Sequence, residues 1–225
     1  MKIRLHLKIF IFIAIFIITK QIQIYATLML FAILHELGHM VAGIVLGFKP
    51  STIEIMPVGL SISFEGEVEN YNKKIKKANK LTLKKLLIAM CGPLTNIVFT
   101  IMFTLFPISI FNIDVQTIVY ANILIAIFNL IPIYPLDGGR ILKYILHLFL
   151  GKKDASYYIN KISYITIVIL TIITSIAILY LKNIAIVIIL AYLWYLVISE
   201  NKKYKNKKQI YDRIKEDAKK YEVIV

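Results

Sequence analysis

The sequence has very little cysteine, and its acidic residues are outnumbered about two to one by basic ones. Its single cysteine, Cys91, excludes an intramolecular disulfide, and we expect Cys91 to be a small buried apolar residue. The 13 Asp and Glu stand against 27 Lys and Arg, which gives a formal net charge of +14. On a soluble protein this excess would indicate nucleic-acid binding, but the positions of the charges favour another explanation.

Apolar residues are in excess, at 59% of the chain. A soluble domain averages about 45–50%, and the surplus here lies in long runs of Ile, Leu, Phe and Val. Runs of about 18 or more apolar residues are typical of membrane-spanning helices. We therefore expect an all-α polytopic membrane protein with about six transmembrane helices. The expected spans are 5–22, 24–47, 84–107, 115–131, 159–181 and 184–199.

The first of these spans has a weaker signal than the others. Its basic start and short apolar stretch are typical of a signal peptide, but no cleavage site precedes the next apolar run, so we expect a retained span. The stretch from Ile9 to Thr19 is about 16 Å long as a helix, against a hydrocarbon core of about 30 Å. Lys8 and Lys20 would have to extend toward the lipid headgroups.

The distribution of lysine and arginine supports this topology. With the N-terminus in the cytoplasm, four segments lie inside: 1–8, 48–85, 132–161 and 200–225. They contain 25 of the 27 basic residues, and the outer loops contain only Lys20 and Lys182. This is the positive-inside pattern. We therefore expect a multi-pass protein of the cell membrane with both termini in the cytoplasm. Its basic residues would line the cytoplasmic face of the lipid bilayer, which explains the net charge without a nucleic-acid partner.

Two of the inner segments have patterns of their own. Residues 51–69 contain short alternating stretches punctuated by Gly59 and Gly66, which predicts a small membrane-associated β segment after the second span. From Asn201 onward the chain is charged and rich in lysine. This tail is either solvated or forms an amphipathic helix on the inner leaflet.

A motif with the chemistry of a metal site lies inside the second span. In His35-Glu36-Leu37-Gly38-His39, two imidazoles four residues apart share one helix face, where they can bind one Zn²⁺. Glu36 then sits beside the metal, where it can accept a proton from bound water. Ionisable groups in hydrocarbon cost several kcal/mol unless they are partnered, so they indicate a functional site. The alternative, a pair of structural histidines, accounts poorly for three such groups within five residues.

A catalytic zinc usually takes three protein ligands and keeps one open position, so a third ligand is expected. The other two histidines, His6 and His147, lie near the membrane interface and are expected to be structural. Asp137 follows the fourth span in a segment broken by prolines and glycines. Irregular backbone at membrane depth is tolerated only when it is buried in protein or lines a polar cavity. Asp137 would reach a depth similar to that of His39. Its alternative role is that of a helix cap or a turn aspartate.

These motifs together resemble the site-2 protease family of intramembrane metalloproteases, peptidase M50. The H-E-x-x-H at 35–39 is joined by N-x-x-P-x-x-P-L-D-G-G at 129–139 and by G-P-x-x-N at 92–96. The resemblance covers about 24–150. Six spans and a compact core without a PDZ-sized insertion are most similar to the stage IV sporulation protein FB group of the family.

The resemblance implies a zinc metalloendopeptidase that hydrolyses a peptide bond in or near a membrane-associated segment of a substrate protein. It implies one Zn²⁺ per chain, held by His35, His39 and Asp137, with Glu36 as the catalytic acid and base. The substrate would be a sporulation sigma-factor precursor, cleaved by regulated intramembrane proteolysis, or alternatively another membrane-anchored regulator. Inhibitory membrane partner proteins are implied as well.

Supporting roles follow from the same resemblance. Asn129 would assist near the substrate or the metal, and so would the third-helix residues Gly92, Pro93 and Asn96. The segment 51–69 would receive the substrate in extended form as an added strand.

The chain is accordingly expected to form an intramembrane metalloprotease domain at 1–200, with its catalytic core at 24–150, and a charged cytoplasmic tail at 201–225. Two other function classes compete with a protease. A zinc transporter would need ligands along a route through several spans. An inactive scaffold that binds client helices would have no need of Glu36.

Overall fold

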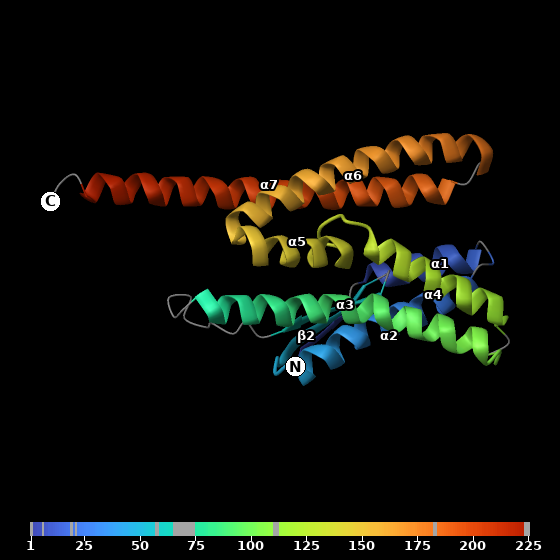
Figure 1. The fold of residues 1–225 in the computed structure, drawn as a ribbon. Coiled ribbons are helices and arrows are strands. Elements are labelled where there is room, and N and C mark those ends of the chain that lie inside the picture. Colours follow the sequence, from blue (N-terminus) through green and yellow to red (C-terminus); the bar gives the residue numbers. More distant parts are fainter. Residues whose placement is uncertain are drawn as a thin grey trace. The chain divides into compact units, whose positions relative to one another are not determined.

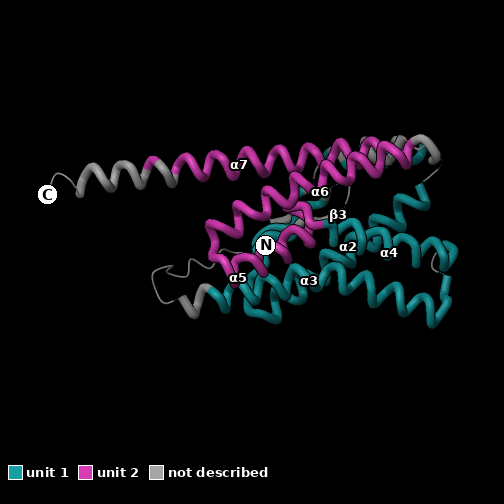
Figure 2. Tube along the Cα trace, turned by 45° about the horizontal axis from the view of Figure 1, so that its top comes forward, with its two compact units in different colours: residues 1–131 teal, residues 132–225 magenta. Residues whose placement is uncertain are grey.

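Figure 1 shows the computed structural model of the chain, which describes residues 2–5, 7–18, 20, 22–56, 59–64, 75–109, 113–181 and 184–222. Over these residues the chain is mainly helical and contains one small sheet. It divides into two compact units, residues 1–131 and 132–225 (Figure 2).

The first unit combines helices with the sheet. Within the described residues, its helices are α1 (Lys8–Ile18), α2 (Ile22–Val45), α3 (Ile75–Leu105) and α4 (Val115–Leu130). Its strands are β1 (Lys2–Leu5), β2 (Pro50–Met56) and β3 (Gly59–Phe64). Helices α2, α3 and α4 pack on one another, and α1 packs on α2.

The core of the first unit is a cluster of aromatic and branched side chains. Phe31 of α2 and Phe103 of α3 meet edge to face, with their ring centroids 6.0 Å apart, beside the buried Ile113 and Ile118. By contrast, apolar residues such as Val98 remain exposed on the outer faces of the helices. Apolar side chains on both the inner and outer faces are expected of helices that are surrounded by lipid.

Three stretches of helix in the described residues are long and apolar enough to cross a membrane: Ile22–Val45, Asn79–Leu105 and Lys152–Ile178. They correspond to the second, third and fifth predicted spans. The fourth predicted span is α4, which is apolar but has 16 residues, or about 24 Å of helix. The first is α1, with 11 residues, and the sixth forms the beginning of α7 (Ile184–Glu222). The expected helical membrane protein with a small β segment after the second helix is confirmed.

The sheet has the order β1-β2-β3 in the part of the chain that is described. Strands β2 and β3 form an antiparallel pair, as predicted for 51–69, although 65–69 lie outside the described residues. Strand β1 is an addition that the sequence did not predict. It pairs parallel to β2, with Lys2 opposite Thr52. Four residues are too few for their alternation to distinguish a strand from the basic start of a span.

Strand β3 packs against the second half of α2. Its last residue, Phe64, lies over Gly43, where any added Cβ would overlap the phenyl ring. The rings of Phe64 and Phe48 also meet, with centroids 6.0 Å apart. Because Gly43 is one helical turn beyond His39, β3 lies alongside the part of α2 that carries the histidine motif.

The second unit consists of α5 (Asp137–Leu150), α6 (Lys152–Leu181) and α7 within the described residues. Gly151, with φ of 85°, separates α5 from α6 and permits a sharp reversal that other residues would resist. Helices α6 and α7 lie side by side and run in opposite directions (Figure 1). The indole N–H of Trp194 in α7 donates to Thr171 Oγ1 in α6 at 3.0 Å.

Helix α7 continues through the predicted end of the membrane domain without interruption. Residues 201–210 include five lysines and no acidic residue, and all five lysine side chains are exposed. Lys203 donates to the Glu200 carboxylate at 2.5 Å, and this hydrogen bond raises the pKa of Lys203 above its ordinary value. The described part of the tail, up to Glu222, belongs to helix α7. The domain boundary at 200 stays a prediction.

A close crossing of α2 and α3 positions the motif. A Cβ added to Gly38 would overlap Thr95 Oγ1 and approach the Cys91 carbonyl oxygen to 3.0 Å. The Thr95 hydroxyl itself donates to that carbonyl at 2.8 Å, which holds it in place. The two helices therefore touch at Gly38, and a larger residue there has no space.

Replacement of Gly38 by alanine is expected to lower the free energy of unfolding by about 1–3 kcal/mol, the usual cost of overpacking, despite alanine's higher helix propensity. Thermal unfolding in detergent measures the change. The double variant Gly38→Ala/Thr95→Ala removes the overlapped hydroxyl and should recover part of the loss. Val41→Ala, on an exposed part of α2, serves as the control. Unfolding of Gly38→Ala at the wild-type temperature would contradict the close crossing.

Candidate metal centre

Helix α2 places the two histidines of the motif one above the other. His35 and His39 are 2% and 5% exposed, and their ring centroids are 4.9 Å apart. Residues four apart lie on the same face of a helix, which explains why both rings face α3 rather than lipid. Imidazoles buried this deeply in an apolar helix need polar partners.

Each ring uses its Nδ1 atom to contact α3. His39 Nδ1 is 2.7 Å from the carbonyl oxygen of Ile88, and His35 Nδ1 is 2.5 Å from Asn96 Oδ1. A carbonyl oxygen can only accept a hydrogen bond, so the proton of the neutral His39 ring is on Nδ1. This tautomer places the lone pair of His39 on Nε2, the arrangement typical of metal-ligating histidines.

Gly92 of α3 provides the space into which both rings point. A Cβ added at Gly92 would overlap Nε2 of His39 and Nε2 of His35. The two Nε2 atoms therefore converge on the same point of α3. Pro93, the next residue, is buried within the same helix.

Asp137 begins α5 and is 5% exposed. A carboxylate in the first helical turn is stabilised by the unpaired N–H groups and the helix dipole. Arg140 Nη1, one turn further on, is 3.7 Å from Asp137 Oδ1. The preceding loop is tied to α6 by the Tyr134 backbone N–H, which donates to Ser163 Oγ at 3.0 Å. Gly139 lies so close to the Ile133–Tyr134 backbone that an added Cβ would overlap it.

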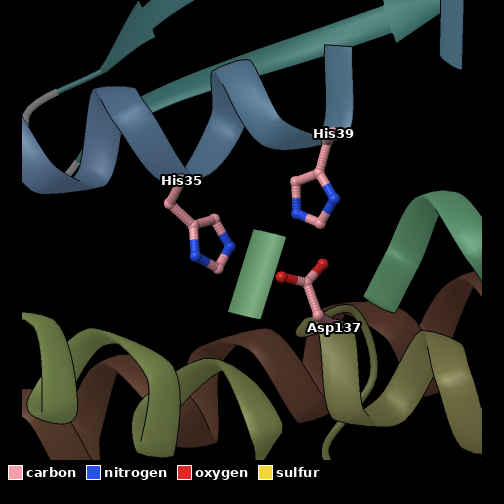
Figure 3. A group of neighbouring side chains, drawn as sticks. All are labelled: His35, His39 and Asp137. Atoms are coloured by element: carbon pink, nitrogen blue, oxygen red, sulfur yellow. The ribbon is translucent and has the colours of Figure 1, made fainter. Parts of the chain in front are cut away.

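Among the described residues, His35, His39 and Asp137 form a group that could hold a metal ion (Figure 3). The ligand atoms that they offer all lie within 4.8 Å of one another, and all three side chains are buried. Two imidazole nitrogens and one carboxylate oxygen are a donor set that suits a catalytic zinc with an open position. The residues present therefore fit the expected ion.

The other predicted site residues differ in their surroundings. Glu36 is partly buried on α2, directly after His35. Asn96 is completely buried and contacts His35, and its supporting role stays a prediction. Asn129 instead donates to the Ile125 carbonyl oxygen of its own helix at 3.1 Å, and its supporting role stays a prediction.

The sequence analysis did not identify Asn122. This residue of α4 is completely buried and accepts a hydrogen bond from Asn96 Nδ2 at 2.9 Å. An amide within an otherwise apolar span could have signalled it, since such a group is costly in hydrocarbon unless it is bonded. His147 lies in the last turn of α5 and Cys91 is half-buried, whereas His6 lies outside the described residues.

Comparisons with known proteins show what the chain is similar to. The family model described as Peptidase family M50 matches residues 113–173, which include Asp137. Stage IV sporulation protein FB of Bacillus subtilis is 26% identical over 144 residues, covering 63% of this chain and 46% of that protein. Zinc metalloprotease MJ0392 of Methanocaldococcus jannaschii is 30% identical over 129 residues, covering 55% of this chain and 34% of that protein. The chain thus spans less than half the length of the curated relatives it matches.

The fold has a counterpart among solved structures. The site-2 protease from Methanocaldococcus jannaschii matches with a TM-score of 0.63 and 23% sequence identity, over 88% of this chain and 89% of that one. The fold is therefore that of a site-2 protease, and the resemblance to peptidase family M50 that the motifs indicated is confirmed.

Proposed function

We propose that the protein is an intramembrane zinc metalloendopeptidase of the site-2 type. The observation that carries this proposal is the buried group of two imidazoles and one carboxylate in an otherwise apolar setting. The match to a peptidase family and the similarity to a zinc metalloprotease support it.

In this proposal, His35, His39 and Asp137 hold one Zn²⁺ per chain. When bound, zinc would lower the pKa of a coordinated water to about 7 and polarise the carbonyl of the scissile peptide bond. His35, His39 and Asp137 would hold the ion in place and would not themselves react with the substrate. The Nδ1 contacts to α3 orient the two rings, and the helix start presents the carboxylate.

Glu36 is the residue that moves protons. It follows His35 directly on α2, and a carboxylate in this position can accept the proton of the attacking water as the new C–O bond forms. It then delivers that proton to the amine nitrogen as the C–N bond breaks, so no other co-reactant is needed. The low polarity of the surroundings strengthens these electrostatic interactions.

The sheet is the proposed receptor for the substrate. Strand β3 is an outer strand in the order β1-β2-β3, so it has backbone groups that β2 does not pair. It also packs along the second half of α2. A substrate segment that unwinds and adds to β3 would be extended beside the motif. Its peptide bonds would then be accessible to attack, whereas the peptide bonds of a helix are not.

The proposed substrate is a membrane-associated protein, and a sporulation sigma-factor precursor is the specific candidate because one relative is a sporulation protein. Another membrane-anchored regulator is the alternative, and inhibitory membrane proteins are proposed partners. We propose that both termini are cytoplasmic, since 25 of the 27 basic residues fall on one side in that topology. The pairing of β1 with β2 supports a common side for the first two basic segments.

Replacement of Glu36 by glutamine is expected to abolish cleavage and leave the metal bound. The amide keeps the size of the side chain but cannot accept the proton, and loss of a general base costs about 10²–10⁴-fold in rate. Wild type and variant are co-expressed with candidate membrane-tethered transcription-factor precursors, and the products are followed on immunoblots. Cleavage that persists in the variant would remove Glu36 from the mechanism.

Replacement of Asp137 by asparagine is expected to weaken zinc retention. A neutral amide oxygen is a poorer ligand than a carboxylate, while the shape of the side chain is preserved. Metal analysis after dialysis against a chelator measures the effect. Asp154→Asn, in the first turn of α6 and exposed, is the matched control. Equal zinc content in wild type and Asp137→Asn would show that Asp137 is not the third ligand.

Replacement of Gly92 by alanine tests the convergence of the two rings. The new methyl group would overlap both Nε2 atoms, so bound zinc should be lost while the helical circular dichroism is retained. Leu94→Ala, in the same helix and 48% exposed, should bind zinc normally. Full zinc occupancy in Gly92→Ala would show that the rings do not meet at this point.

A further inference from the structure

We propose that Asn122 of α4 is a positioning residue that acts through Asn96 to determine which nitrogen of His35 carries the proton. The inference rests on the proposed function of His35 as a zinc ligand. It concerns residues of the first unit alone.

Three hydrogen bonds connect α4 to the His35 ring. Asn122 Nδ2 donates to the Ile118 carbonyl oxygen at 2.9 Å, and Asn122 Oδ1 accepts from Asn96 Nδ2 at 2.9 Å. Asn96 Oδ1 is 2.5 Å from His35 Nδ1. Both amides are completely buried and the ring is 2% exposed, so water does not compete for these bonds.

The chain of bonds has a defined direction because it begins at a backbone carbonyl. The Ile118 oxygen can only accept, so the NH₂ group of Asn122 faces Ile118 and its oxygen faces Asn96. The NH₂ group of Asn96 must then face Asn122, which turns the Asn96 oxygen toward His35. An oxygen in this position accepts, and His35 Nδ1 must therefore be the donor.

This direction determines the chemistry available to His35. A neutral ring with its proton on Nδ1 has its lone pair on Nε2, the atom that faces Gly92. The opposite tautomer would place a proton where the metal is expected. His39 obtains the productive tautomer directly from the Ile88 carbonyl. His35 obtains it from an amide, which could rotate by 180° if Asn122 did not prevent this.

The remaining contact of Asn96 is weak by comparison. Its Nδ2 lies 3.5 Å from the Phe31 carbonyl oxygen, at the limit of a hydrogen bond. Asn122 is thus the stronger of the two groups that hold the Asn96 amide in its productive orientation. Removal of the Asn122 acceptor should allow both amide orientations, and therefore both tautomers of His35.

The tautomer can be measured directly by ¹⁵N NMR of histidine-labelled, metal-free protein in detergent, with the His35 signals assigned by their loss in His35→Gln. We expect the Nδ1–H form in the wild type and a mixture of tautomers in Asn122→Leu. As the neutral acid, Asn122→Asp keeps a donor toward the Ile118 carbonyl and an acceptor oxygen toward Asn96. It should therefore retain the Nδ1–H form, which a merely structural role for Asn122 would not predict. An unchanged tautomer in Asn122→Leu overturns the proposal.

Zinc affinity, measured by competition with a chelator, provides the second readout. Loss of a partner that orients a metal ligand typically costs about 10–100-fold in affinity, so Asn122→Leu should weaken binding by at least about tenfold. Because both asparagines act along one path, Asn96→Leu/Asn122→Leu should bind no more weakly than Asn96→Leu. Additive losses would show that Asn122 acts independently of Asn96.

The matched control is Thr27→Val in α2. Thr27 is also buried and also donates to a carbonyl four residues earlier, that of Gln23. Its loss should leave both the tautomer and zinc affinity unchanged. A tautomer that responds to Asn122 in a protein that binds no zinc would refute the proposed function and support this inference. Zinc binding together with an unresponsive tautomer would do the reverse.

Discussion

Two imidazoles within an apolar helix must be hydrogen-bonded to be stable there, and α3 provides the bonds. Asn96 and the Ile88 carbonyl each engage an Nδ1 atom, and this requires α3 to lie against α2. Gly38 and Gly92 make that approach sterically accessible, since a methyl group at either would overlap the facing helix. Satisfaction of the buried rings and close packing of the two helices are therefore one constraint, and the placement of the two histidines follows from it.

The Asp137 carboxylate is positioned differently, by the start of helix α5. The prolines between α4 and α5 end one helix and allow another to begin at Asp137, where the first turn stabilises negative charge. The backbone of the loop is in turn bonded to α6 through Ser163. A helix terminus at this position supplies a carboxylate whose orientation depends on backbone geometry more than on a flexible side chain, and such preorganisation is what a metal site requires.

The sheet, which is the proposed receptor for the substrate, also packs on α2. Its hairpin lies along α2 through Phe64 and Gly43, so strand β3 packs on the helix that carries His35 and His39. Strand β1 closes the other side of β2 with the first residues of the chain. In the proposed function, the substrate must become extended before it is cut. A receptor strand and a proton acceptor that are both fixed relative to α2 would meet this need without a large rearrangement.

The helical membrane class, the hairpin within 51–69 and the proposed ligand set could be predicted from the sequence. Apolar runs are long enough to be recognised without their partners, and ionisable residues within them are too costly to be incidental. The pairing of Lys2–Leu5 with β2, the contact of Asn122 with Asn96 and the direction of the hydrogen bonds to His35 could not be predicted. Each is a contact between segments far apart in the chain. Local pattern states which groups need a partner, but only the packed helices and strands decide which atom that partner will be.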